Sequence, residues 1–236
     1  MRFFSLLAHI LFPASCLCCQ KRTANHSLCD ACRDHLSLHI HHTCPHCQKR
    51  QTSKGQVCMK CFDISPLDGV FSVLSYQDPI VKECIYAFKY SFVQTLAKPF
   101  GIRMARRLQH EDIPLCNIII PIPLHPLRFR WRGFNQAQLL AESLAQHLLP
   151  FHTLPLRTDL LIRKRFTKTQ AKIFSKKERE KNLHNAFSFQ GDPLAIKEKT
   201  IWLIDDISTT NSTLTECARI LKKNGAKEVW GITLAR

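Results

Sequence analysis

Acidic residues are scarce in this chain of 236 residues. Aspartate and glutamate together number 18, against 34 lysines and arginines, and the formal net charge at pH 7 is +16. This scarcity excludes a near-neutral surface. It favours partners that are polyanions: nucleic acid, phosphorylated small molecules or an anionic membrane surface.

Long uncharged apolar runs are also missing, and after the N-terminal residues no stretch is suited to span a bilayer. The first sixteen residues, MRFFSLLAHILFPASC, have the pattern of a secretory or lipoprotein signal. The competing interpretation is a short amphipathic helix that Pro13 ends before a metal site. We favour the helix because Cys16 is needed as a member of a cysteine pair. The expected location is the cytoplasm, with a membrane-peripheral position as the alternative.

Disulfide-scaffold character is missing as well, although the chain has twelve cysteines. Eight of them form four Cys-x-x-Cys pairs, a spacing that suits metal better than disulfides. Thiolates held by metal fit a reducing compartment. The pairs are Cys16/Cys19, Cys29/Cys32, Cys44/Cys47 and Cys58/Cys61.

The spacing between successive pairs repeats, with nine residues in the gap 20–28 and ten in the gap 48–57. This repeat predicts two consecutive Cys₄ zinc ribbons over about residues 10–66. We expect two structural zinc ions, because all ligands are thiolates and so short a segment cannot bury much core. An interleaved pairing of the first with the third pair is the alternative, and His46 is a candidate substitute for one thiolate.

From Leu67 the sequence alternates between strand-like and helix-like patterns. Such alternation predicts an α/β domain with a mostly parallel sheet over residues 67–236. We expect strands at 70–76, 117–120, 200–204 and 228–234, and helices at 80–90, 94–109, 134–149 and 212–223.

The segment 200–214, TIWLIDDISTTNSTL, is the most informative part of the chain. An apolar strand leads into Asp205 and Asp206, and a loop rich in hydroxyls then leads into a helix. Free amides and the dipole at a helix start attract phosphate. The two carboxylates can accept from ribose hydroxyls or hold Mg²⁺ through water. The loop residues are Ser208, Thr209, Thr210, Asn211, Ser212 and Thr213.

An ordinary strand-turn-helix is the alternative interpretation of this segment. Two adjacent acids are unfavourable for stability alone, because like charges crowd. The carboxyl end of a parallel strand is also the usual ligand position in such folds. We therefore favour a functional site.

The segment 120–136, IPIPLHPLRFRWRGFNQ, combines prolines with alternating arginine and aromatic residues. The prolines predict a stiff, extended loop over 121–126 that includes Pro121 and His125. Alternation in an extended chain places three guanidiniums on one side, suited to phosphate. The aromatics between them either stack bases or anchor the loop in the core. The arginines are Arg128, Arg130 and Arg132, and the aromatics are Phe129 and Trp131.

The segment 157–185 is crowded with lysine and arginine and has little apolar periodicity. Such a run is typical of a solvated loop. Beside a phosphate pocket it would serve as a lid or as a tether for a polyanion.

The segment 200–214 resembles the 5-phosphoribosyl-1-pyrophosphate (PRPP) motif of type I phosphoribosyltransferases. The match holds except at Asn211, where that motif has Gly. Glycine there supplies a positive φ and a close approach to phosphate. Asparagine is the next most tolerant residue for this conformation. Its side chain is expected to intrude on phosphate space and to weaken PRPP binding.

The whole pattern resembles the ComF family of competence-associated proteins. The resemblance rests on the four cysteine pairs, on PIPLH, RGFNQA and IDDISTTNSTL, and on the elements at 167–170, 179 and 182. It implies a cytoplasmic protein with a type I phosphoribosyltransferase fold and a part in handling single-stranded DNA during natural transformation. Competence-machinery proteins are further implied partners.

Two functional hypotheses follow. In the first, the pocket binds PRPP with Mg²⁺ without turnover in a protein that handles single-stranded DNA. In the second, the protein moves phosphoribosyl from PRPP to an amine or base. In both, Asp205 and Asp206 serve ribose and metal, the loop 208–213 holds the 5-phosphate, and the loop 121–125 with nearby arginines faces pyrophosphate. In the second, Asp205 and Asp206 are the catalytic pair. The charge, the Arg/aromatic alternation and the zinc ribbons favour the first.

Overall fold

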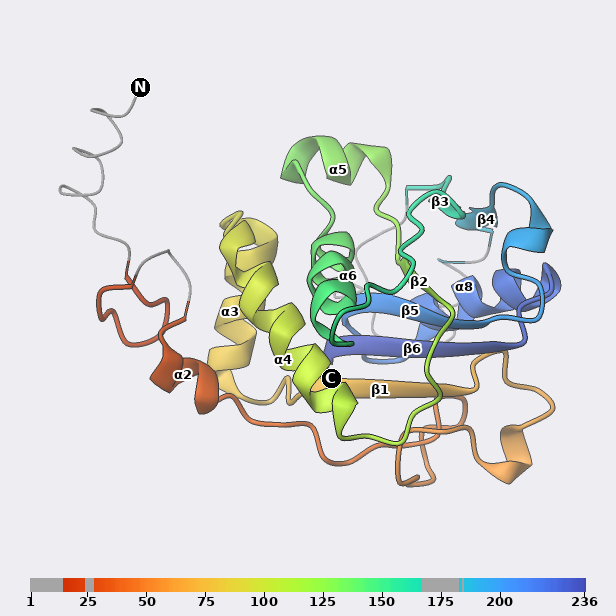
Figure 1. Ribbon diagram of the computed structural model, residues 1–236, viewed down its shortest axis with the longest axis horizontal. Helices are drawn as coiled ribbons and strands as arrows, with labels where there is room; N and C mark the ends of the chain where they lie inside the picture. Colours follow the sequence, from red (N-terminus) through yellow and green to blue (C-terminus); the bar gives the residue numbers. More distant parts are fainter. Residues whose placement is uncertain (1–14, 24–27, 167–182, 184) are drawn as a thin grey trace.

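The computed structural model describes residues 15–23, 28–166, 183 and 185–236 (Figure 1). The expected N-terminal amphipathic helix lies outside these residues. Most of the basic run, including 167–182, lies outside them too. The family elements at 167–170, 179 and 182 fall in that part of the chain.

Four parallel strands form the central sheet: β1 (Gly69–Leu74), β6 (Glu228–Ala235), β5 (Thr200–Ile207) and β2 (Ile118–Pro121). Their order is β1-β6-β5-β2, and every neighbouring pair is parallel. The two central strands are almost wholly buried, as expected for strands that are covered on both faces. The predicted mostly parallel sheet is confirmed.

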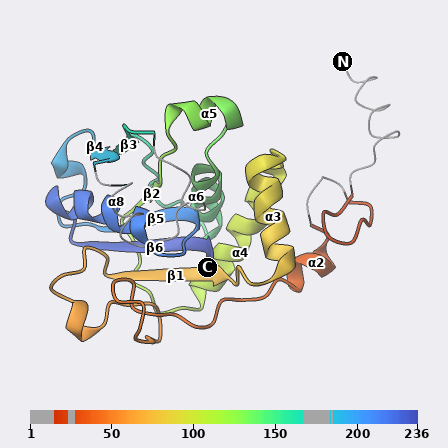
Figure 2. The same cartoon turned by 180° about the vertical axis from the view of Figure 1, so that it is seen from behind.

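Helices cover both faces of this sheet (Figures 1 and 2). On one face lie α3 (Pro79–Tyr90), α4 (Ala97–Gln109) and α6 (Gln136–His147), and on the other lies α8 (Ser212–Lys223). Successive side chains of a strand point to opposite faces. Trp202 and Ile204 of β5 therefore join the core with α3, α4 and α6, while Ile201 and Leu203 join the core under α8.

Outside the central sheet, two features differ from the sequence expectations. Residues Pro126–Arg132 form a helix, α5, instead of the continuation of an extended loop. The proline at the first helical position is compatible with this, because its missing N–H has no partner in the first turn. A two-stranded antiparallel pair, β3 (Leu161–Arg163) with β4 (Phe187–Phe189), was not predicted.

Among the described residues, the short elements are α2 (Asp30–Asp34) in the cysteine-rich segment and three single turns of 3₁₀ helix. The turns are η1 (Met59–Cys61), η2 (Gln94–Leu96) and η4 (Pro193–Ala195).

The cysteine-rich segment runs along the outer edge of β1. The amide of His39 donates to Val73 O at 2.9 Å, and the amide of Val70 donates to Gly55 O at 2.9 Å. Gly55 has φ +78°, and a Cβ there would lie 2.0 Å from Val70 O, so only glycine allows this approach. These contacts cover an edge that would otherwise present unpaired backbone groups. The expected boundary between residues 66 and 67 stays a prediction, and backbone hydrogen bonds cross it.

Candidate functional site

The two adjacent acids lie inside β5, which continues to Ile207 and does not end at residue 204 as predicted. Asp205 Oδ1 accepts from the amide of Asp206 at 2.8 Å, and Asp206 Oδ1 accepts from the amide of Ile207 at 2.8 Å. Asp206 is only 7% exposed. These local bonds hold both carboxylates in fixed orientations at the carboxyl end of the strand.

Lys89, near the end of α3, neutralises one of the acids. Its Nζ lies 2.7 Å from Asp206 Oδ2. Burial alone lowers the pKa of Lys89, but the Asp206 carboxylate raises it above its usual value, so the ammonium keeps its charge. Sequence reasoning missed Lys89, because a lysine in the last turn of a helix has no distinguishing pattern and its pairing depends on how α3 packs on the sheet.

The second acid is strongly affected by the first. Burial, followed by the negative charge of Asp206, raises the pKa of Asp205 to about 8, although Lys89 opposes this. Two carboxylates in one site cannot both ionise without cost. Asp205 is therefore the member of the pair that holds a proton near neutral pH when no further cation is bound.

The hydroxyl loop follows directly and leads into α8, which begins at Ser212 as predicted. Ser208 Oγ donates to Asn211 Oδ1 at 2.7 Å, and the hydroxyls of Thr210 and Ser212 lie 2.8 Å apart. Asn211 is the N-cap residue of α8, and its side chain makes no hydrogen bond to the first turn of the helix. The amides of that first turn have no partners within the helix and can face an anion.

Asn211 adopts the left-handed conformation expected at the position where the PRPP motif has glycine, with φ +59° and ψ +6°. Its side chain is 2% exposed, and Nδ2 donates to Pro45 O at 3.0 Å. The amide is thus turned toward the cysteine-rich segment, and its expected intrusion into phosphate space stays a prediction.

The arginines of α5 do not share one side. Residues two apart on an α-helix point about 200° apart, so Arg128 and Arg132 lie on one face and Arg130 on the opposite face. Arg132 Nη1 donates to Gln136 Oε1 at 2.6 Å. Burial lowers the pKa of Arg132, and the Asp206 carboxylate opposes this, so Arg132 lies toward the acids. The prediction of three guanidiniums on one side is wrong because it assumed an extended chain.

His125 serves as the N-cap of α5, and its Nδ1 accepts from the amide of Leu127 at 3.2 Å. Pro121 is the last residue of β2 and pairs with Ile204, immediately before Asp205. The structure thus brings the start of the proline-rich loop beside the acids.

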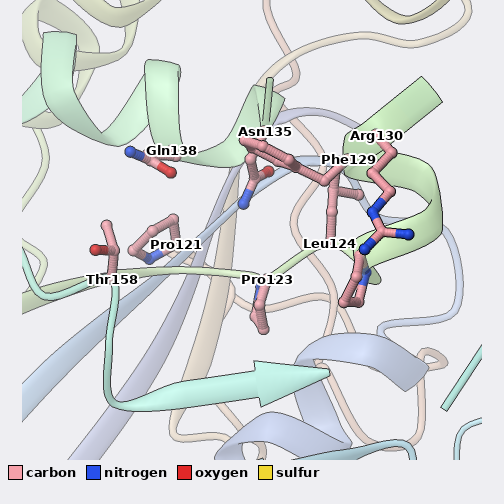
Figure 3. Close-up of a pocket in the computed structure, with 9 residues that line it drawn as sticks. Pro121, Pro123, Leu124, Phe129, Arg130, Asn135, Gln138 and Thr158 are labelled. Carbon is pink, nitrogen blue, oxygen red and sulfur yellow. The ribbon is translucent and has the colours of Figure 1, made fainter. Parts of the chain in front are cut away.

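A cavity of about 320 Å³ lies between the proline-rich loop, α5 and the start of α6 (Figure 3). Its polar lining comes from Arg130, Asn135, Gln138 and Thr158, of which sequence reasoning singled out only Arg130. The acids and the hydroxyl loop do not line it. The apolar lining is Pro121, Pro123, Leu124, Pro126 and Phe129.

Four exposed aromatic residues form a second surface, here named the aromatic patch: Tyr86, Tyr90, Phe92 and Trp131. The ring of Trp131 lies 5.4 Å from that of Phe92 and 6.2 Å from that of Tyr90. Trp131 is 57% exposed, so it does not anchor the core. The guanidinium of Arg132 lies 5.7 Å from the rings of both Tyr90 and Trp131.

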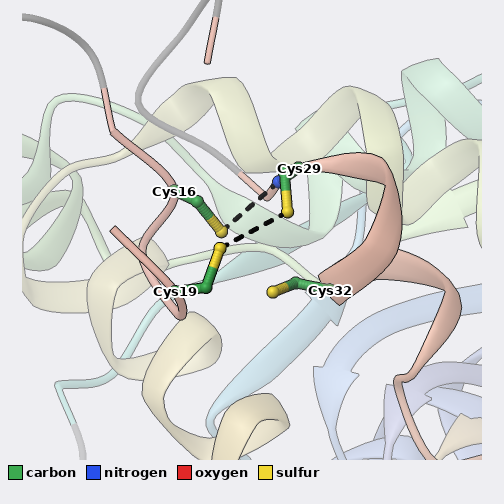
Figure 4. A group of neighbouring side chains, drawn as sticks. All are labelled: Cys16, Cys19, Cys29 and Cys32. Atoms are coloured by element: carbon green, nitrogen blue, oxygen red, sulfur yellow. Dashed lines mark hydrogen bonds between the residues drawn. The ribbon is translucent and has the colours of Figure 1, made fainter. Parts of the chain in front are cut away.

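The eight paired cysteines gather into two clusters, and within each the four sulfur atoms lie within 4.8 Å of one another. The first cluster joins the first two pairs (Figure 4), and the second joins the last two. The consecutive arrangement is therefore found, not the interleaved one. Neither cluster, within the described residues, includes His46 or Cys18.

The sulfur geometry fits zinc. A tetrahedral site with Zn–S bonds of about 2.3 Å places its sulfurs about 3.8 Å apart. Cys19 Sγ and Cys29 Sγ lie 3.6 Å apart, and Cys47 Sγ and Cys58 Sγ lie 4.0 Å apart. Four thiolates leave no open position on the metal, which is the arrangement of a structural site.

No helix among the described residues is long and apolar enough to cross a membrane.

Comparison with known proteins agrees with this architecture. The double zinc ribbon domain family matches residues 7–63. The chain is 31% identical over 231 residues to Competence protein F of Haemophilus influenzae, which covers 96% of this chain and 93% of that protein. It is 32% identical over 217 residues to Competence protein ComFC of Bacillus subtilis, covering 89% and 84%. It is 30% identical over 234 residues to the DNA utilization protein YhgH of Salmonella typhi, covering 92% and 96%.

Solved structures similar to this chain include phosphoribosyltransferases. The glutamine PRPP amidotransferase from B. subtilis has a TM-score of 0.36 at 20% identity and covers 59% of this chain and 26% of its own. A hypoxanthine phosphoribosyltransferase from Staphylococcus aureus has a TM-score of 0.31 at 14% identity and covers 61% and 62%.

The parallel sheet and the cysteine clusters define an α/β protein with a double zinc ribbon. The extended identity to the competence proteins then places it more closely: the chain belongs to the ComF family.

Two zinc ions per chain are expected from elemental analysis of the purified protein. Cys58→Ser should lower the content to about one and loosen the N-terminal segment before the sheet, because three thiolates hold zinc less well than four. Cys18→Ser is the matched control, since Cys18 belongs to neither cluster. Disulfides in place of zinc would contradict the assignment.

Asp205→Asn should gain stability relative to wild type as the pH rises. Folding raises the pKa of Asp205 from its ordinary value to about 8, so between about pH 4 and pH 8 the folded chain keeps a proton that the unfolded chain releases. This group's contribution is present below about pH 4 and is lost as the pH rises to about 8. Asparagine has no such dependence.

Urea unfolding of both proteins from about pH 4.5 to about pH 8 checks this. The difference in the free energy of unfolding should grow by up to about 1.4 kcal/mol per pH unit. A difference that stays constant over this range contradicts the raised pKa.

Proposed function

We propose that this protein binds PRPP with Mg²⁺ at the acidic pair and the hydroxyl loop, and that it handles single-stranded DNA during natural transformation. The observation that carries the first part is the placement of Asp205 and Asp206 directly before the hydroxyl loop and the open amides of α8. The names of the relatives, which refer to competence and DNA utilization, support the second part.

Each group in the site has a role that follows from its chemistry. The hydroxyl of Thr210 and the first amides of α8 would hold the 5-phosphate, while the Ser208 hydroxyl, which donates to Asn211, would fix the shape of the loop. The carboxylates would accept from the ribose hydroxyls and hold Mg²⁺ through water. Arg132, which lies toward Asp206, would face the pyrophosphate group.

Lys89 supports this assignment because it compensates the acids when no ligand is bound. Its ammonium pairs with Asp206, while Asp205 holds a proton near neutral pH. A magnesium ion would replace that proton as the balancing positive charge. Binding of PRPP with Mg²⁺ should therefore release a proton below about pH 8.

The alternative function is an active phosphoribosyltransferase. An amine or ring nitrogen would form the new bond at the anomeric carbon as the bond to pyrophosphate breaks, and no protein nucleophile is needed. One observation favours it: the cavity beside α5 is large enough for a nucleobase and starts at Pro121, which pairs with the residue before Asp205. Release of pyrophosphate with mixed bases and amines would separate this function from binding alone.

The aromatic patch supports binding of single-stranded nucleic acid. Exposed rings offer stacking faces to bases, and the Arg132 guanidinium beside Trp131 adds positive charge at the same place. The net charge of +16 supplies attraction to the phosphate backbone. The rings that we propose as stacking faces lie at the surface shared by α3 and α5 and not on an extended loop.

PRPP with MgCl₂ at millimolar concentration should raise the thermal unfolding temperature of the wild-type protein, because a ligand of the folded state stabilises it by mass action. Thr210→Ala and Asp206→Asn should each reduce this rise. Thr153→Ala is the matched control, an exposed threonine outside the site. If wild type shows no rise, the pocket assignment fails.

Binding to a labelled single-stranded oligonucleotide should weaken steeply with salt, by about 0.7 log units in the binding constant per phosphate contact for each log unit of salt. Fluorescence anisotropy at several salt concentrations measures this slope. Replacing Arg128, Arg130 and Arg132 together should flatten it.

Trp131→Ala should weaken binding of the same oligonucleotide by about 1–3 kcal/mol if the ring stacks a base. Phe151→Ala is the control, since Phe151 is a fully exposed aromatic outside the aromatic patch. An equal effect of the two substitutions, or binding that ignores salt, contradicts the proposal.

A further inference from the structure

A hydrogen bond joins the hydroxyl loop to the second cysteine cluster. Asn211 Nδ2 donates to Pro45 O at 3.0 Å across 166 positions of sequence, while its Oδ1 accepts from Ser208 Oγ at 2.7 Å. The asparagine is 2% exposed. Its amide therefore bonds the loop with one atom and the zinc ribbon with the other.

Pro45 belongs to the turn that carries two ligands of the second cluster, Cys44 and Cys47. The turn is closed by backbone bonds from Gln48 N to Cys44 O at 2.9 Å and from Cys44 N to Arg50 O at 2.8 Å. The second pair of ligands contacts this turn through Cys58, whose amide donates to Cys44 Sγ at 3.4 Å. Because bound metal fixes such a turn, it also fixes the direction of the Pro45 carbonyl.

At the other end, Asn211 stands where the loop turns into α8. Its carbonyl accepts the amide of Thr215 at 2.8 Å, which opens the helix, and its left-handed backbone sets the turn. Glycine would adopt the same φ but would leave the Pro45 carbonyl and the Ser208 hydroxyl without this partner. The side chain thus supplies a tie that the backbone conformation does not.

We propose that Asn211 is a positioning residue through which zinc in the second cluster sets the shape of the hydroxyl loop. Loss of that zinc loosens the turn around Pro45, and the loop loses its buried anchor. By linkage, a ligand that requires the ordered loop also slows the loss of zinc from the second cluster. This last consequence rests on the proposed function, whereas the coupling of zinc to the loop does not.

Hydrogen exchange measured by mass spectrometry tests the coupling in the full chain with zinc bound. Asn211→Asp keeps the size and the tolerance for positive φ but removes the donor to Pro45 O. Amides in 208–214 should exchange about fivefold faster in this variant, while amides in 201–206 should not change. Asn211→Gly serves as a second variant if the aspartate disturbs folding.

Two cysteine substitutions separate the zinc sites. Cys47→Ser weakens the second cluster and should speed exchange in 208–214, whereas Cys19→Ser weakens the first cluster and should leave that segment unchanged. In the Asn211→Asp background, Cys47→Ser should add little, because the connection is already broken. A merely structural role of Asn211 predicts additive effects. Additive effects, or equal effects of Cys47→Ser and Cys19→Ser, overturn the proposal.

The ligand arm uses PRPP with MgCl₂ and the release of zinc to a chromogenic chelator. One phase of zinc release should be absent in Cys47→Ser, and the ligand should slow that phase in the wild-type protein. Asn211→Asp should remove this protection and weaken PRPP binding about fivefold to tenfold. If wild type does not bind PRPP, the proposed function fails while the exchange results still decide the coupling. If PRPP binds wild type and Asn211→Asp equally well, its linkage to zinc is overturned.

Discussion

The pairing of Lys89 with Asp206 is the interaction on which the site depends. Two carboxylates at the end of a buried strand would repel each other and lose hydration, and β5 could not hold both as anions without compensation. The ammonium of Lys89, 2.7 Å from Asp206, and a proton on Asp205 together supply it. The packing of α3 on the sheet is thus an electrostatic requirement of the acidic pair as well as a source of apolar core.

That same packing places the exposed end of α3 beside α5. Tyr90 follows Lys89 directly, and its ring contacts Trp131. Arg132 lies between the acidic pair and the aromatic patch. The Asp206 carboxylate opposes the lowering of its pKa by burial, and its guanidinium lies 5.7 Å from the ring of Trp131. The acidic pair and the aromatic patch are therefore neighbours, which fits a protein proposed to bind both a phosphoribosyl ligand and a nucleic acid strand.

The zinc ribbon segment makes direct backbone hydrogen bonds to the sheet. Its backbone pairs with β1 at His39 and Gly55, and Pro45, in the Cys44–Cys47 turn, accepts a hydrogen bond from Asn211. A segment of this length has little core of its own and depends on metal for its shape. Through these contacts the metal-dependent part of the chain supports both an edge of the sheet and the loop at its carboxyl end.

Local patterns in the sequence determined the elements that depend only on neighbouring residues. The Cys-x-x-Cys spacing sufficed to predict two Cys₄ clusters, because one turn delivers two sulfurs wherever the chain lies. The 3.6-residue apolar period correctly predicted α8 from Ser212 to Lys223, and the apolar runs predicted all four parallel strands.

Only the tertiary structure decided what depends on distant partners. Prolines and alternating arginines favoured an extended segment. The segment instead forms a helix capped by His125, and the helix places the arginines on two faces. Lys89 pairs with Asp206, and Pro45 bonds to Asn211. Each pair joins residues more than 100 positions apart. No local period encodes such pairs, because they form only when packing brings separate elements together and removes the alternative partner, water.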